Sequence, residues 1–396
     1  MKKKLNIGLF GFGCVGKGIY EVLQKTTGVN VEIKTICIRS REKKRSLPEH
    51  FFTYNPASII QDNEIDVVVE LINDSDAAFE ILKSSLASGK HVVTANKKMV
   101  AEHLSEIIDL QKRHQRSVLY EGAVCGSIPV LRNLEEYYNT DSIISIEGIC
   151  NGTTNYILTK MVDENLSFNA ALTQAQTLGF AESNPDSDVK GFDARYKLSI
   201  LIAHAFGVLV PAEKIPVIGI DLINSFDQRF AKKNKLTIKL IAKAWTEGTQ
   251  LFASVSPTFL SNDNILSSIN NEINAVRIEG KFSGNQVFIG RGAGSHPTAA
   301  AVLSDISALN YNYKYAYHKM DRYRYTVAEN YKINAFVRTK KDDIPLISEF
   351  ETFHSGNADH EWHSISGNLS SEKLWEWSQN GIPAIINHPV TLPAER

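Results

Sequence analysis

A glycine-rich turn near the start of the chain constrains the fold more than any other part of the sequence. The residues Gly11-Phe12-Gly13-Cys14-Val15-Gly16 form a G-x-G-x-x-G pattern directly after the apolar segment Leu5–Phe10. That segment predicts a strand, and Gly16–Thr26 predicts a helix. Between a strand and a helix, such glycines permit a tight turn and let the backbone approach a pyrophosphate. The pattern therefore favours a dinucleotide-binding site at the helix N-terminus over an ordinary glycine-rich turn.

Strands and helices alternate after this turn. The strands are short and rich in β-branched residues, and this alternation is typical of a doubly wound parallel sheet. The predicted strands are Val31–Ile38, Val67–Leu71, His91–Val93 and Val118–Tyr120, and the predicted helices are Ala77–Ser88 and Ala101–His114. The expected fold class is α/β, with a Rossmann-type sheet over residues 1–135.

The pattern changes to a mixture of looser strands and longer helices from about residue 136. We expect a second, α+β domain over residues 136–295 and a small α+β appendage over residues 329–396. The predicted elements of the second domain are the strands Ser142–Ile149 and Ile273–Phe282 and the helices Tyr156–Asp163 and Asp193–Phe206. Those of the appendage include the strand Lys332–Arg338, the helix Ser371–Gln379 and the strand Pro383–Asn387.

Composition argues against nucleic-acid-binding and membrane proteins. The 396 residues are 43% hydrophobic and 22% charged, which is typical of a globular protein with more than one domain. Lys and Arg total 43 against 44 Asp and Glu, so bulk charge gives no reason to bind nucleic acid or a membrane surface. No stretch reaches the roughly 20 apolar residues of a membrane span.

Cysteine usage and the first residues indicate the compartment. The cysteines Cys14, Cys37, Cys125 and Cys150 form no C-x-x-C pair, which is typical of free thiols in a reducing environment. The opening lysines run directly into Leu5–Phe10 without the apolar core of a signal peptide. We therefore expect a cytoplasmic protein.

Arginines follow the second predicted strand, in the sequence Ile38-Arg39-Ser40-Arg41. NAD enzymes usually carry Asp or Glu here for the ribose 2′-hydroxyl, whereas Arg accommodates the 2′-phosphate of NADP. Exposed basic residues are often only solvated surface, but these stand where a phosphate would bind. The sequence favours NADP over NAD, with Arg39 as the phosphate contact.

Two polar clusters carry candidate chemistry. Thr94-Ala95-Asn96-Lys97-Lys98 follows a buried strand, at the sheet edge where open α/β folds bind ligands, although a solvated lysine pair is an equally good interpretation. The segment Gly179–Asp188 is rich in carboxylates and turn formers and leads into a helix on which Asp193 and Lys197 share a face. That pair alone would be a surface ion pair. Beside Glu182 and Asp188 it fits a pocket for an ammonium-bearing substrate, with Lys197 as general acid or base.

Together these clusters resemble homoserine dehydrogenases. The matching segments occur in the family's order and cover roughly residues 5–325: Gly11–Gly16, Thr94–Lys97, Glu121–Pro129, Asn151–Leu158, Gly179–Lys197 and Gly292–Ala299. The resemblance implies NAD(P)-dependent interconversion of L-homoserine and L-aspartate 4-semialdehyde. That reaction belongs to threonine, methionine and isoleucine biosynthesis. It also implies a homodimer formed through the second domain.

The resemblance further implies roles for single residues. Lys197 would donate the proton and Lys97 would lie near the substrate and the nicotinamide. The residues implied for substrate binding are Glu182, Asp188, Asp193, Lys190, Gly152 and Thr153, although relatives often carry an acidic or neutral residue at position 190. Those for the cofactor are Gly11, Phe12, Gly13, Cys14, Val15, Gly16, Arg39, Thr94, Lys97 and Gly294.

Two loops receive roles in the same way. The Glu121 carboxylate and the carbonyls of Val124, Gly126 and Ile128 would bind a sodium ion, where a plain turn is the alternative. The loop Gly292–Thr298 would contact the nucleotide, with His296 as a loop histidine without a catalytic role. The helix Ala299–Leu309 after it returns residues 296–328 to the nucleotide-binding domain.

The C-terminal region departs from many relatives, which end in a threonine-binding ACT domain. Residues 329–396 lack the usual Asp-x-Pro-Gly entry and have Asp342-Asp343-Ile344-Pro345 instead. A degenerate ACT-like fold and an unrelated cap both remain open, and we do not expect regulation by threonine.

Three other function classes fit parts of the sequence. An aspartate-semialdehyde dehydrogenase would need a nucleophilic cysteine, for which Cys125 is the candidate, but it leaves Gly179–Lys197 unexplained. A nucleotide sensor without catalysis would not need both lysines. An oxidoreductase with a different amino or hydroxy substrate is the closest alternative.

Overall fold

The computed structural model describes residues 4–41, 44–322, 324–340, 348–358 and 362–387. The chain divides into two compact units, each built from separate stretches. Unit 1 comprises Met1–Ser142, Ser199–Pro211 and Gly290–Tyr323, and unit 2 comprises Ile143–Leu198, Ala212–Ile289 and Arg324–Arg396. Asp342–Pro345, which bore on the ACT comparison, lie outside the described residues.

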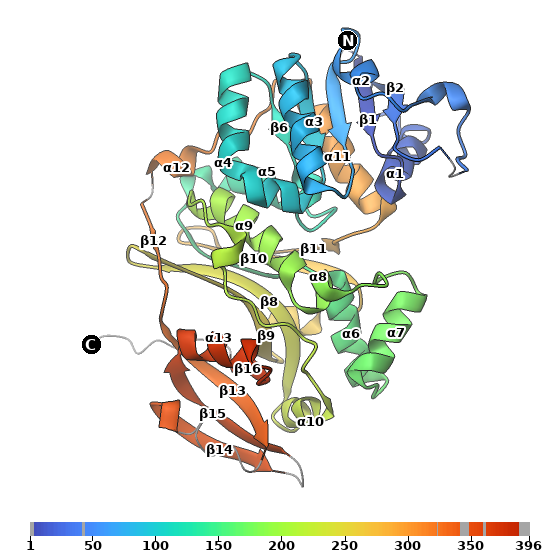
Figure 1. Cartoon of the computed structure of the whole chain (residues 1–396). Coiled ribbons are helices and arrows are strands. Elements are labelled where there is room, and N and C mark those ends of the chain that lie inside the picture. The colour runs from blue at the N-terminus through green and yellow to red at the C-terminus, as the bar shows by residue number, and fades with distance from the viewer. Residues whose placement is uncertain (1–3, 42–43, 323, 341–347, 359–361, 388–396) are drawn as a thin grey trace. The chain divides into compact units, whose positions relative to one another are not determined.

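Unit 1 contains a parallel sheet with the strand order β3-β2-β1-β4-β5-β6 (Figure 1). Its strands are β1 (Leu5–Phe10), β2 (Val31–Cys37), β3 (Phe52–Thr53), β4 (Val67–Glu70), β5 (His91–Thr94) and β6 (Val118–Leu119). The chain reverses its direction of travel across the sheet between β1 and β4, and this switch point is where doubly wound sheets bind ligands. β4 is buried along its whole length, as expected when helices cover both faces of the sheet.

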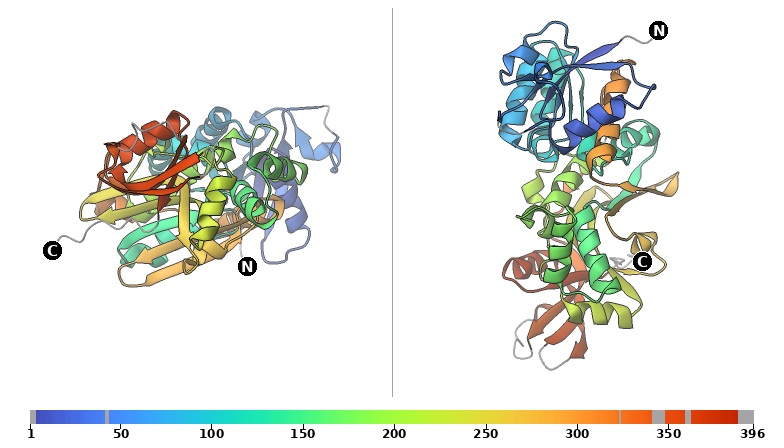
Figure 2. Two further views of the ribbon diagram at one scale, coloured as in Figure 1. Left: turned by 90° about the horizontal axis from the view of Figure 1, so that it is seen from below. Right: turned by 90° about the vertical axis from the view of Figure 1, so that its right-hand side faces the viewer.

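The helices of unit 1 follow the sheet strands, apart from two that come late in the chain. They include α1 (Cys14–Leu23), α2 (Ala57–Ile60), α3 (Ser75–Ala87), α4 (Lys97–His114), α5 (Val130–Glu135), α11 (Ser295–Leu309) and α12 (His318–Arg322). α11 packs alongside α1, as Figure 2 shows, although most of the chain separates them in sequence.

Unit 2 contains one long mixed sheet with the order β11-β10-β7-β8-β9-β16-β13-β15-β14, and β12 pairs with β9. Its strands are β7 (Ile143–Ile149), β8 (Leu236–Glu247), β9 (Gln250–Ser261), β10 (Ile273–Gly280), β11 (Gly284–Arg291), β12 (Thr326–Val327), β13 (Lys332–Lys340), β14 (Thr352–Ala358), β15 (Trp362–Ser370) and β16 (Ala384–Asn387). Its helices include α6 (Gly152–Asp163), α7 (Phe168–Thr177), α8 (Asp186–Val189), α10 (Ser225–Lys233) and α13 (Ser371–Gln379). A further helix, α9 (Phe192–Phe206), contributes residues to both units.

The C-terminal strands continue this sheet. β16 lies between β9 and β13, parallel to β9 through Ile386 and Thr258 and antiparallel to β13. The segment β15–α13–β16 is a split βαβ unit, because β13 lies between its two strands. α13 contacts β13 and β15, and its Leu374, Trp375 and Trp377 belong to the hydrophobic cluster of this region.

The expected fold class is confirmed, and the largest differences lie at helix starts and in unpredicted strands. α3, α4 and α6 begin two to four residues before their predicted starts, because Asp74, Asn96 and Asn151 cap them. The long hairpin β8–β9 was not predicted, although Leu236–Lys239 and Ala253–Thr258 alternate apolar with polar residues. In the described part of the chain, no helix is long and apolar enough to cross a membrane.

Candidate functional sites

The glycine-rich turn has the geometry that a bound dinucleotide needs. Gly11 has φ of +97°, and a Cβ on it would lie 2.8 Å from the carbonyl oxygen of Leu71. A Cβ on Gly16 would lie 2.6 Å from the carbonyl oxygen of Gly11, so the helix packs tightly against the turn. Gly13 is exposed, and a Cβ there would meet no atom within 4 Å. The turn thus leaves open space beside the backbone at the start of α1, which fits a pyrophosphate.

The start of α11 borders the same turn. The Ser295 hydroxyl donates a hydrogen bond of 2.8 Å to the carbonyl of Cys14, the first residue of α1. Gly294 caps α11 with φ of +114°. His296 lies in the first turn of this helix rather than in a loop, and its Nε2 is 3.0 Å from a Glu21 carboxylate oxygen. Helix α11 begins earlier than the predicted Ala299, and it brings Gly294 beside the glycine-rich turn.

Basic and aromatic side chains surround the end of β2. Arg39 is exposed, and the Arg41 guanidinium lies 4.5 Å from the centre of the Tyr54 ring. Arg45 donates a 2.6 Å hydrogen bond to the Ser40 carbonyl. The buried Phe12 ring of the glycine-rich turn packs edge-on against Phe52, with ring centres 5.5 Å apart.

The segment between β5 and α4 is held by its own side chains. Thr94 is completely buried, and its hydroxyl donates to a Glu70 carboxylate oxygen at 2.6 Å and accepts from the Asn96 amide at 3.0 Å. The Asn96 side chain caps α4 by accepting from the Met99 amide at 3.0 Å. Lys97 is the first residue of α4 and is half-buried. Thr94 therefore shapes the segment that presents Lys97.

A buried lysine cluster lies in unit 2. Lys197 Nζ donates to Asp193 Oδ2 at 2.6 Å and to the Cys150 carbonyl at 2.7 Å. Lys197 and Asp193 lie one turn apart on α9, as predicted, and both are buried. Burial makes the pair more than a surface ion pair, because its charges are shielded from water.

Asn151 joins this cluster and was not among the predicted site residues. Its side-chain amide donates to Asp188 Oδ1 at 2.7 Å and to Asp193 Oδ2 at 2.8 Å. Its side-chain oxygen accepts from the Thr154 amide at 2.8 Å and so caps α6. Asn before a helix is a recognisable cap signal in the sequence, but its bond to Asp188 links residues 37 apart.

The remaining predicted substrate residues have hydrogen-bond partners outside this cluster. Thr153 is buried and donates to the Phe180 carbonyl at 2.6 Å, and a Cβ on Gly152 would lie 2.7 Å from the Glu272 carbonyl oxygen. Glu182 is exposed and uses its backbone carbonyl to accept from Gln176. Lys190 is also exposed, and its Nζ pairs with Asp186 at 2.9 Å. Among the described contacts, neither Glu182 nor Lys190 joins the Lys197 hydrogen bonds.

The Glu121 carboxylate accepts hydrogen bonds from the backbone amides of Leu131 and Arg132, at 2.8 and 2.9 Å. It therefore caps the start of α5. The loop after it turns sharply, with φ of +52° at the buried Cys125 and +53° at Gly126. Within the described residues, no group of three or more His, Cys, Asp and Glu side chains could hold a metal ion, so cation binding here would depend on backbone carbonyls.

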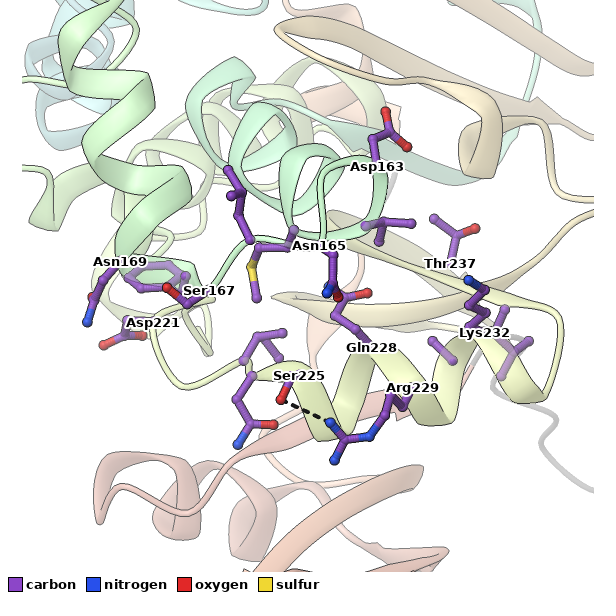
Figure 3. A pocket seen from close by; sticks show the side chains of 18 of the residues that line it. Asp163, Asn165, Ser167, Asn169, Asp221, Ser225, Gln228, Arg229, Lys232 and Thr237 are labelled. Carbon is purple, nitrogen blue, oxygen red and sulfur yellow. Dashed lines mark hydrogen bonds between the residues drawn. The ribbon is translucent and has the colours of Figure 1, made fainter.

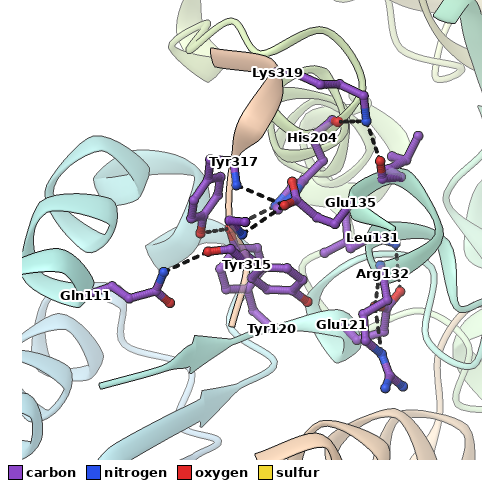
Figure 4. Close-up of polar contacts among 12 residues, drawn as sticks. Gln111, Tyr120, Glu121, Leu131, Arg132, Glu135, His204, Tyr315, Tyr317 and Lys319 are labelled. Carbon is purple, nitrogen blue, oxygen red and sulfur yellow. Dashed lines mark hydrogen bonds and ion pairs between the residues drawn. The ribbon is translucent and has the colours of Figure 1, made fainter. Parts of the chain in front are cut away.

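Unit 1 also contains a buried polar network around His204, as Figure 4 shows. The His204 ring bonds to Glu135 through Nδ1 at 2.7 Å and to the Tyr120 hydroxyl through Nε2 at 2.9 Å. Tyr120 also bonds to the Tyr317 hydroxyl at 2.7 Å. Although burial opposes it, the neighbouring His204 lowers the pKa of Glu135 to about 2. The network ties α5, α9 and the segment before α12 together.

A large open cavity lies elsewhere in unit 2. Its volume is about 1290 Å³, and Figure 3 shows it between the α6–α7 connection and α10. Asp163, Asn165, Gln228 and Arg229 are among its lining residues. No residue of the Lys197 cluster lines it, so we do not assign the reaction to this cavity.

Comparison with known proteins agrees with the geometry. The family model for the homoserine dehydrogenase NAD-binding domain matches residues 11–121, and the homoserine dehydrogenase model matches residues 129–307. The homoserine dehydrogenase of Bacillus subtilis is 40% identical over 319 residues, which cover 78% of this chain and 74% of the relative.

Solved structures agree over the same regions and beyond them. A homoserine dehydrogenase from Thiobacillus denitrificans matches with a TM-score of 0.87 and 27% identity, covering 98% of this chain and 99% of the other. A hyperthermophilic archaeal homoserine dehydrogenase mutant in complex with NADPH matches with a TM-score of 0.68 and 26% identity, covering 79% of this chain and 100% of that one.

The dinucleotide-binding sheet and these relatives define an NAD(P)-dependent oxidoreductase that acts on a CH–OH group. The lysine–carboxylate cluster lies in the region that the catalytic family model matches. The chain belongs to the homoserine dehydrogenase family. It interconverts L-homoserine and L-aspartate 4-semialdehyde. This reaction excludes the two alternatives of an aspartate-semialdehyde dehydrogenase with a Cys125 nucleophile and a nucleotide sensor without catalysis.

Proposed function

We propose that Lys197 transfers the proton to and from the substrate oxygen in this reaction. The observation that carries the proposal is the position of its ammonium group, buried between the Asp193 carboxylate and the Cys150 carbonyl. These acceptors fix the lysine in one place, and a fixed acid needs little reorganisation during reaction. A bound nicotinamide supplies or accepts the hydride. Lys97, at the start of α4, is the second lysine that we assign to the substrate and nicotinamide.

The carboxylates around Lys197 suit the amino group of the substrate. Asp188 and Asp193 are held in place by the same Asn151 amide, which supports an ammonium-binding role. We assign Gly152, Thr153, Glu182 and Lys190 to the surrounding pocket, with Glu182 and Lys190 reaching the substrate from the surface.

We also propose that the enzyme prefers NADP(H) to NAD(H). Arg39 is exposed after β2, and Arg41 is stacked on Tyr54, so cationic side chains surround the end of this strand. The NADPH bound by the archaeal relative supports the same choice. The turn Gly11–Gly16 would hold the pyrophosphate, with Gly294 at the start of α11 beside it.

The test compares wild type with Lys197→Ala and Lys197→Arg, following NADPH oxidation with aspartate 4-semialdehyde. Arginine keeps the positive charge beside Asp193 but does not release a proton near neutral pH. We expect kcat to fall by about 10²–10⁴ in both variants, with unchanged NADPH affinity. An arginine variant that keeps the wild-type kcat would remove proton transfer from the role of Lys197.

Further assignments concern the cation, the assembly and the domains. We propose that a sodium ion binds the carbonyls of Val124, Gly126 and Ile128 beside Glu121. Replacing Na⁺ by a bulky organic cation in the activity assay would test this site.

We propose a homodimer formed through the sheet of unit 2. Sedimentation would test this oligomeric state. The proposed domains are residues 1–135 with about 296–328, residues 136–295, and residues 329–396 as a degenerate ACT-like region.

A further inference from the structure

Glu70 is a buried carboxyl group to which neither the proposed mechanism nor the family resemblance assigns a role. It ends β4, whose other residues are Val67, Val68 and Val69, and its exposed fraction is 0%. A carboxyl group is costly to place in such apolar surroundings unless it is hydrogen-bonded. Burial raises the pKa of Glu70 to about 7, against the opposing effect of its hydrogen bonds from Thr94 and Ile72.

Those hydrogen bonds form a closed ring. Glu70 accepts from the Thr94 hydroxyl and from the Ile72 amide, both at 2.6 Å. The Asn96 amide donates to Thr94 Oγ1, and the Asn96 side chain donates to the Ile72 carbonyl, both at 3.0 Å. Since Glu70 and Thr94 are also paired across β4 and β5, the ring joins the carboxyl ends of two neighbouring strands.

The ring of hydrogen bonds also lies next to the glycine-rich turn Gly11–Gly16. Leu71 lies between Glu70 and Ile72, and its carbonyl oxygen is the atom that Gly11 approaches so closely. On the other side, Asn96 caps α4 immediately before Lys97. The β1–α1 turn, the segment after β4 and the start of α4 therefore meet around one carboxyl group.

We propose that Glu70 is a positioning residue for the dinucleotide, and that its ring of hydrogen bonds with Ile72, Thr94 and Asn96 sets the shape of the cofactor-binding edge. In this arrangement Thr94, which the family resemblance assigns to the cofactor, acts on it through Glu70 and Asn96. The consequence for Lys97 rests on the role proposed above for that lysine, whereas the consequence for cofactor binding does not.

The experiment measures the dissociation constant of NADPH by fluorescence in the absence of substrate. Thr94→Val removes the hydroxyl from the ring, and we expect it to weaken NADPH binding by about tenfold or more, since two hydrogen bonds are lost. Thr94→Ser keeps the hydroxyl, and we expect affinity within about threefold of wild type. Glu70→Gln keeps the shape but leaves one donor unpaired, so its effect should lie between these two.

Ser85→Ala is the matched control. Ser85 is a completely buried hydroxyl of α3 in the same unit, bonded to the Ile81 carbonyl at 2.7 Å and outside the ring. We expect it to lower the melting temperature without changing NADPH affinity. If Thr94→Val and Glu70→Gln also lower only the melting temperature, the ring is structural and the proposal is wrong.

A double variant separates a ring from independent contacts. Once Thr94→Val has opened the ring, adding Glu70→Gln should weaken NADPH binding little further. The reason is that the effects of two substitutions on binding free energy do not add when the two residues are coupled. Fully additive losses would contradict the ring. Because no substrate is present, these results stand even if the proton-transfer role of Lys197 fails its own test.

Discussion

A neutral amide rather than a cation bridges the two carboxylates beside Lys197. Asn151 donates to Asp188 and Asp193 at once, so the cluster combines two carboxyl groups with one ammonium group. That arrangement leaves it with the sign of charge that attracts the ammonium group of an amino-acid substrate. A lysine or arginine in place of Asn151 would cancel this attraction.

We therefore expect Asn151→Ser to raise the KM for homoserine by about tenfold or more without changing NADPH affinity. Serine still caps α6, since its hydroxyl accepts from the backbone, but it cannot bridge both carboxylates. Steady-state kinetics with homoserine as the varied substrate measure the effect.

Asn224→Ser is the control, because Asn224 caps α10 in the same unit and lies outside the lysine cluster. An unchanged KM in Asn151→Ser, or an equal rise in both variants, would contradict the bridging role.

Only some of the residues in the candidate sites could be predicted from the sequence. The Asp193–Lys197 pair was predictable, since residues four apart on a helix share a face. Asn151, Glu70 and His204 were not identified, because their partners lie on other strands and helices and no local pattern links them. A pattern search also cannot reveal burial, which distinguishes the Lys197 pair from an ordinary surface ion pair.

At the scale of elements, the contact between α1 and α11 brings two helix starts together. A Cβ on Gly18 would lie 2.5 Å from Ser295 Oγ and 2.7 Å from the Ser295 carbonyl oxygen. The side chain of any other residue here would push α11 away from α1. The same contact brings Ser295 to the Cys14 carbonyl, beside the turn assigned to the pyrophosphate.

We expect Gly18→Ala to cost about 1–3 kcal/mol of stability and to weaken NADPH binding, because overpacking displaces α11. Thermal unfolding and NADPH fluorescence measure the two effects. Gly28→Ala serves as the comparison, since its Cβ would meet nothing closer than 3.7 Å. Wild-type affinity in Gly18→Ala would show that the start of α11 does not shape the cofactor site.

Elements differ in how well their sequences predict them. Five of the six strands of the parallel sheet were predictable as short apolar runs, whereas the two-residue strand β3 was not predicted. Helix starts were placed late, since apolar periodicity begins after the capping residue that sets the true start. β8 and β9 were not predicted, although Ala253–Thr258 alternates apolar with polar residues. The sequence pattern also does not show that the polar residues Ser254, Ser256 and Thr258 are buried.

At the scale of the whole molecule, the buried Glu70 makes stability depend on pH. The folded protein raises its pKa from 4.5 to about 7, so the folded state holds this proton more tightly than the unfolded state does. Stability from this group is therefore fully present below pH 4.5 and is lost as pH rises towards and through 7.

Between about pH 5 and pH 8, we expect wild type to lose about 2 kcal/mol of stability relative to Glu70→Gln, which cannot titrate. Melting temperatures of both proteins across this range provide the measurement. Parallel pH profiles for the two proteins would mean that Glu70 stays ionised in the folded state.

Unit 1 also has a consequence for how the protein is made. Ser295 and Cys14, which bond to each other in the finished fold, are 281 residues apart. A ribosome adds roughly 5–20 residues each second, so α1 waits on the order of tens of seconds for α11 to emerge. During that interval the face of α1 that packs against α11 lacks its partner helix. We therefore expect the yield of folded enzyme to depend on translation speed, although the finished protein keeps no trace of the delay.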